Sequence, residues 1–224
     1  GTPSIYGSNC DRHGNACWVG VSSELTFFDP FRIALDAAYG SVDMGSYKAT
    51  NGKNFDAQRA GWFASILAEY KMDYFTPVVL FWYASGDDSN AYNGSERMPA
   101  VEASWDISAY GFDGNFGRDA CDMIGLTNDG KMGVYLQAKD ISFMEDLTHI
   151  FRVGFIKGTN NTEMARQGFA SPTGKSGREL YLTTADKAWE VNFDTQYKIY
   201  KDLTLAVEIG YINLDLDKGV WSKG

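Results

Sequence analysis

The residues best suited to covalent or metal chemistry lie close to the start of the chain. Cys10 and Cys17 enclose the polar stretch "DRHGNA", which also contains His13. In an oxidising compartment two thiols this close in sequence can form a disulfide. A metal site using both thiols and the imidazole is the alternative, but a structural zinc site takes four protein ligands and no fourth lies nearby. The sequence therefore makes Cys10 and Cys17 a candidate disulfide and predicts no metal site.

A second group of candidate ligands is the acidic stretch around 86–130, in which carboxylates outnumber arginines. Hard cations such as Ca²⁺ bind clustered carboxylates. Asp113, Asp119 and Asp122 in "DGNFGRDACD" are the calcium candidates, although this stretch contains no calcium-loop signature. A solvated extracellular surface is the preferred interpretation, and an inward-folded constriction or a contact with a neighbouring subunit are the alternatives. We therefore expect no cofactor, with Ca²⁺ as the one candidate.

Catalysis is not indicated by the histidines and nucleophiles of the chain. The two histidines are His13 and His149, and neither stands in a readable Ser–His–acid arrangement. The formal net charge of −9 also argues against a nucleic-acid partner, because such a chain repels phosphates. We therefore expect neither an enzyme nor a nucleic-acid-binding protein.

Charged side chains recur at alternate positions of otherwise apolar stretches. In the segment 187–216, "KAWEVNFDTQYKIYKDLTLAVEIGYINLDL", almost every second residue from Ala188 onward is apolar and those between are mostly polar. This alternation places apolar and polar side chains on opposite faces of a β-strand. The charges predicted to share the polar face, half basic and half acidic, are Glu24, Arg32, Asp36, Arg59, Glu69, Lys71, Lys139, Arg152, Glu190, Asp194, Lys198 and Glu208.

Eight such stretches predict eight strands and an all-β fold. Their approximate ranges are 17–28, 31–42, 59–71, 74–85, 131–142, 147–157, and two within 187–216 on either side of "YKD". The connections alternate strictly between short turns ("DPF", "KMD", "FMED", "YKD") and longer segments, of which "MGSYKATNGKNFDA" is the first. Outer-membrane β-barrels show this asymmetry, and many of these stretches have the length that a tilted strand needs to cross a bilayer.

Aromatic placement supports a transmembrane antiparallel up-and-down β-barrel. Rings gather near the ends of the predicted strands, which suits the two membrane–water interfaces. A soluble β-sandwich that holds these rings in its core is the alternative. The aromatic residues concerned are Trp18, Phe28, Tyr39, Trp62, Tyr70, Trp189, Tyr200 and Tyr211.

The stretch "AWEVNFDTQYKIYKDLTLAVEIGYINLDLD" resembles the penultimate hairpin of the outer-membrane homotrimeric porins of sulfate-reducing bacteria. The stretch "CWVGVSSELTFFDPFRIALDAAYGSVD" is similar to an earlier hairpin of that family. The resemblance implies a trimeric diffusion pore of about sixteen strands in the bacterial outer membrane. On that template residues 1–224 form a single barrel domain, the C-terminal half of a longer protein, with the last strand following Gly224.

The expected function is passive diffusion of small hydrophilic solutes and ions through a water-filled channel. The expected partners are the lipid bilayer, lipopolysaccharide and, by resemblance, two further copies of the protein. Opposed walls of charge would set the selectivity, with Arg32, Arg59, Lys71, Lys139 and Arg152 on one side and the carboxylates on the other. A plugged barrel with a structural or adhesive role is the alternative, and a closed eight-stranded barrel packed with side chains is one form of it.

Overall fold

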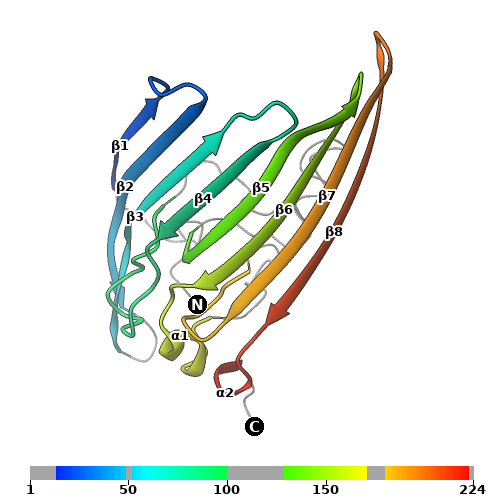
Figure 1. The fold of residues 1–224 in the computed structure, drawn as a ribbon. Helices are drawn as coiled ribbons and strands as arrows, with labels where there is room; N and C mark the ends of the chain where they lie inside the picture. The colour runs from blue at the N-terminus through cyan, green and yellow to red at the C-terminus, as the bar shows by residue number, and fades with distance from the viewer. Residues whose placement is uncertain (1–13, 49–51, 100–128, 171–179, 222–224) are drawn as a thin grey trace.

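The computed structural model describes residues 14–48, 52–99, 129–170 and 180–221, and it shows an almost entirely β chain. Eight strands form one antiparallel sheet in which each strand pairs with its neighbours in the sequence (Figure 1). They are β1 (Asn15–Leu25), β2 (Phe31–Lys48), β3 (Asn54–Tyr70), β4 (Thr76–Ala84), β5 (Lys131–Met144), β6 (Leu147–Gly158), β7 (Lys187–Tyr200) and β8 (Leu203–Asp215). Two short helices are α1 (Thr162–Arg166) and α2 (Lys218–Trp221). No helix among the described residues is long and apolar enough to cross a bilayer.

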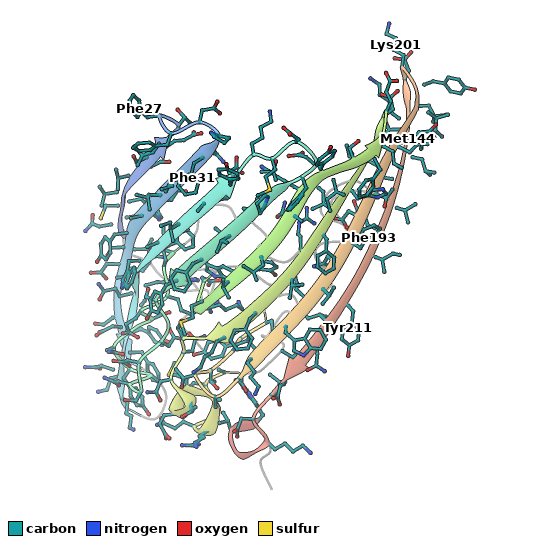
Figure 2. All side chains as sticks on the ribbon, viewed as in Figure 1. Phe27, Phe31, Met144, Phe193, Lys201 and Tyr211 are labelled. Carbon is teal, nitrogen blue, oxygen red and sulfur yellow. The ribbon has the colours of Figure 1, made fainter. Side chains whose placement is uncertain are left out.

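The sheet is curved and open (Figure 1). In the described part of the chain β1 and β8 each pair with one strand only, so they form the two edges. Short turns join the strands at one end of the sheet, which we call the turn end, and Figure 2 labels Phe27, Met144 and Lys201 there. The opposite end, which we call the loop end, carries the longer connections and both helices.

All eight predicted strands are present, but the long loop predicted between the second and third is wrong. β2 continues to Lys48 and β3 begins at Asn54, so these strands have 18 and 17 residues. The pairing register shifts between Asp43 and Ser46, where Gly45 has a φ of +82°. This irregularity puts the alternation out of phase, and glycine adopts such a backbone without steric cost. The β2–β3 connection is therefore short, which breaks the predicted strict alternation of connections.

β4 is much shorter than β3, and a segment outside the strands fills the space it leaves. β4 has 9 residues and ends at Ala84. Beyond this point Ser95 pairs with β3 in parallel: Ser95 N donates to Gln58 O at 2.9 Å, and Ala60 N donates to Ser95 O at 2.8 Å. The connection 85–99 thus completes hydrogen bonds along an edge that would otherwise present free backbone groups.

Burial on this sheet is inverted relative to a soluble protein. The apolar cross-strand partners Phe155 and Trp189 are 44% and 43% exposed, whereas Glu190, the residue after Trp189, is 0% exposed. The strand register places residues of the same kind side by side, giving an outer face of exposed apolar side chains and an inner face of polar ones. Phe193 and Tyr211, both labelled in Figure 2, belong to the outer face.

Aromatic rings on the inner face lie over glycines of the next strand. The Trp82 ring occupies the space that a Cβ at Gly133 would need, and the Tyr135 ring does the same over Gly154. The two rings stack with their centroids 5.5 Å apart. A side chain at either glycine would displace a ring, so the absence of a Cβ is what lets the rings pack flat on the sheet.

Trp18 follows the same rule, so its ring is not on the outer face. It lies on the inner face over Gly40, and its indole N–H donates to Pro99 O at 2.8 Å. This hydrogen bond satisfies the donor of a ring that is partly covered by the chain. Alternation indicates the same face, because Trp18 lies two residues before Gly20 and six before Glu24 on the polar side of the predicted strand.

We expect Gly154→Ala to lower the free energy of unfolding by about 1–3 kcal/mol, because the new methyl group collides with the Tyr135 ring. The control is Gly20→Ala on the inner face of β1, where the nearest atom to an added Cβ is Ala37 O at 3.3 Å. Denaturant unfolding followed by circular dichroism measures both. Equal losses in the two variants would contradict the interlocking of ring and glycine.

Candidate functional site

Of the charges predicted to share the polar face, all except Lys71 lie on the inner face of the sheet. β3 ends at Tyr70, and Lys71 is exposed in the turn that follows. The strand register places the others on the inner face, namely Glu24, Arg32, Asp36, Arg59, Glu69, Lys139, Arg152, Glu190, Asp194, Lys198 and Glu208.

Four of these side chains form a charge ladder across the inner face near the turn end. Arg32 on β2 contacts Glu24 on β1 at 2.5 Å and reaches Glu69 on β3 at 3.3 Å. Lys139 on β5 donates to the other oxygen of Glu69 at 2.7 Å, across the intervening β4. The signs alternate along the ladder. Here basic and acidic residues are interleaved, and the prediction of two opposed walls is wrong for these four residues.

A buried ion pair joins β6 and β7 further from the turn end. Arg152 Nη1 lies 2.5 Å from Asp194 Oδ2, and Arg152 Nε donates to Gln137 Oε1 at 3.3 Å. The Arg152 and Asp194 side chains are only 13% and 8% exposed. An isolated charge so far from water would be strongly destabilising, so the pairing is a condition for burying either group.

Glu190 is the acceptor at the centre of a second buried group. Its carboxylate accepts from the Tyr135 hydroxyl at 2.5 Å and from Asn192 Nδ2 at 3.0 Å. Alternation in the sequence placed Tyr135 and Asn192 on the polar face but assigned them no role. The ladder, the ion pair and this group together make the inner face a dense polar surface.

Arg59 ties the sheet to the connection that follows β4. Its Nη2 contacts Asp129 Oδ2 and donates to Met98 O at 2.9 Å, while its Nε donates to Arg97 O at 3.2 Å. Arg97 pairs with the same oxygen of Asp129. Two guanidinium groups therefore share one carboxylate at the loop end.

The segment 96–99 lies on the inner face rather than in solvent. Gly61 faces inward, and an added Cβ there would collide with the backbone of Glu96 and Met98. Pro99 continues toward β1, where it accepts the hydrogen bond from Trp18. The interpretation of the acidic stretch as solvated surface is thus wrong for this part.

Several sequence candidates lie outside the described residues. Among them are Cys10 and the calcium candidates Asp113, Asp119 and Asp122. Cys17, the other half of the candidate disulfide, is exposed on β1.

Tyr181 joins the connection after β6 to the connection after β4. Its hydroxyl donates to Asp87 Oδ2 at 2.8 Å, and Ser95 Oγ donates to Asp87 Oδ1 at 2.6 Å. The Arg97 guanidinium lies 5.4 Å from the centroid of the Tyr181 ring. Burial raises the pKa of Tyr181, and the Asp87 carboxylate raises it further, so the hydroxyl stays a donor. Burial also raises the pKa of Glu96 in the same assembly.

The described residues show no metal-binding group. Within these ranges no three His, Cys, Asp or Glu side chains are placed to hold a metal ion. His149 stacks on Phe193 on the outer face, and its Nδ1 lies 2.9 Å from Thr195 Oγ1.

No known family model matches the chain, and no curated protein matches it either.

We expect Arg152→Met to lower the free energy of unfolding by about 3–5 kcal/mol, because Asp194 then stays buried without the Arg152 cation. The control is Lys187→Met, which breaks an ion pair to Asp215 whose side chains are 56% and 62% exposed. That loss should stay below about 1 kcal/mol.

Urea unfolding curves of the two variants give the comparison, and adding Asp194→Asn to Arg152→Met should recover part of the loss. If Arg152→Met were no more destabilising than Lys187→Met, the Arg152 cation would not be needed to bury Asp194.

Proposed function

We propose that this chain forms part of the wall of a transmembrane β-barrel, a porin of a bacterial outer membrane that passes small hydrophilic solutes and ions by passive diffusion. The observation that carries the proposal is the inverted burial of the sheet. A continuous apolar face in water favours aggregation, whereas in lipid it is the stable arrangement. The polar inner face then borders a water-filled lumen.

The open edges of the sheet support a barrel larger than these eight strands. A bilayer does not tolerate a lipid-exposed sheet edge, so β1 and β8 need further partner strands. A barrel of about sixteen strands, assembled as a homotrimer with lipopolysaccharide around it, is the form that the resemblance implies. The strands have 9 to 18 residues, enough for the roughly 9–11 residues that a tilted strand needs to cross the bilayer.

A barrel with a blocked lumen and a structural or adhesive role is the second candidate, and one observation favours it. Leu180 and Leu182 pack on the inner face against Trp82, Tyr135 and Ile156. A segment that covers the inner face takes space from a channel. Conductance distinguishes the two candidates.

The membrane orientation is tested with nitroxide labels at two adjacent positions of β2. Leu35 is on the outer face and Asp36 on the inner face, and both are exposed. In liposomes we expect a label at Leu35→Cys to collide with oxygen, which concentrates in lipid, and a label at Asp36→Cys to collide with a water-soluble nickel chelate. A preference for the nickel chelate at both positions would mean that the outer face is in water, as in a soluble sandwich.

Transport is tested by single-channel recording of the purified full-length protein in a planar bilayer under a salt gradient. An open trimer gives large steps that close in threes, while a folded protein that never conducts would support the blocked barrel. Lys139→Gln should shift the reversal potential toward cations, because it removes a positive charge from the ladder and keeps Glu69. The control is Lys187→Gln at an exposed position outside the inner face, which should leave the potential unchanged.

A further inference from the structure

Residues 180–186, which we call the strap, lie directly on the inner face near the loop end. Gly158 at the end of β6 faces inward, and a Cβ added there would collide with the backbone of Leu182 and Thr183. Leu182 is 0% exposed. A segment that connects two strands thus crosses the polar face with its apolar side chains turned onto the sheet.

Asp186 fastens the strap to the chain that follows β8. Its Oδ2 accepts from Thr183 N at 2.7 Å and from Thr183 Oγ1 at 2.6 Å. Its Oδ1 accepts from Asp217 N at 2.8 Å and from Trp221 Nε1 at 2.9 Å. All four partners are donors, which suits a carboxylate that is 0% exposed. The strap is therefore attached to α2 at its β7 side.

Asn160 holds the strap from the β6 side. Its Nδ2 donates to Leu182 O at 2.7 Å, and its backbone O accepts from Thr184 N at 2.8 Å. Asn160 is 1% exposed. Attachment on both sides makes the strap a fixed part of the wall, and a fixed element can define a constant width.

We propose that the strap is a constriction, in which residues 180–186 narrow the water path at the loop end and limit the size of the solutes that pass, with Leu180 and Leu182 packed beneath them on the sheet. Asp186 is the positioning residue that keeps the strap on the inner face. This proposal rests on the proposed function, because an inner face that encloses no lumen has no path to narrow.

The position of the strap is tested by thiol labelling of the full-length protein with its native cysteines replaced by serine. We expect Leu182→Cys to react slowly with a water-soluble maleimide. Adding Asp186→Asn should raise the rate about tenfold, because hydrogen bonds to a charged group are lost. Trp221→Phe, which removes one donor and keeps an aromatic ring at this position, should raise it less. Asp215→Asn, a change at an exposed carboxylate, is the control and should have no effect.

The width is tested by recording the same variants in planar bilayers with polyethylene glycols of increasing size. Asp186→Asn should raise the conductance and the largest polymer that enters, and Asp215→Asn should change neither. A channel that conducts with an unchanged size limit although the thiol becomes reactive would overturn the constriction and leave the porin intact. A thiol that already reacts fast in the parent protein would overturn the fixed strap. Absence of conductance in every variant, with the expected labelling pattern, would overturn the porin and the constriction with it.

Discussion

Buried charges on the inner face are stable only with a partner, and this requirement organises the rest of the structure. A strand alternates strictly, so a charge placed on the buried face has no way to turn outward. Its partner must come from another strand at the right register, as Asp194 does for Arg152 and Glu69 does for two cations. Pairing across strands thus restricts which residues can face each other, and it adds to the register set by the backbone ladder.

The same requirement draws the long connections inward. Arg59 lies near the loop end, and the carboxylate it contacts belongs to Asp129, outside the sheet. Where the segments between the strands cross the inner face, their own polar groups need partners there. Asp87, for example, accepts hydrogen bonds from the hydroxyls of Ser95 and Tyr181. The ordered loop end is therefore a consequence of charge on the wall as much as of packing.

The strands and their faces could be predicted from the sequence because alternation is a local property. The fourth strand is an exception, because the stretch 74–85 is apolar on both faces and alternation cannot assign them; the structure puts Trp82 inward over Gly133. Which charges meet depends on register between strands, and single-strand patterns do not contain it. This is why Arg32 and Glu69 were assigned to opposite walls although they are cross-strand partners.

The paths of the connections could not be predicted for a related reason. The hydrogen bond between Tyr181 and Asp87 joins residues that are 94 positions apart in the sequence, and no pattern within either segment indicates that they meet. A weaker signal was present in Gly61 and Gly158, because glycine within a strand often marks the close approach of another backbone. Both glycines indeed face a crossing segment.

The short β4 has a consequence for how the chain can diverge. Surface connections between strands usually accept insertions and deletions with little effect. The connection after Ala84 is different, because Ser95 within it takes the place of a strand residue beside Gln58 and Ala60. An insertion or deletion between Ala84 and Ser95 would shift the register of that pairing. Related chains should therefore keep the length of this connection constant.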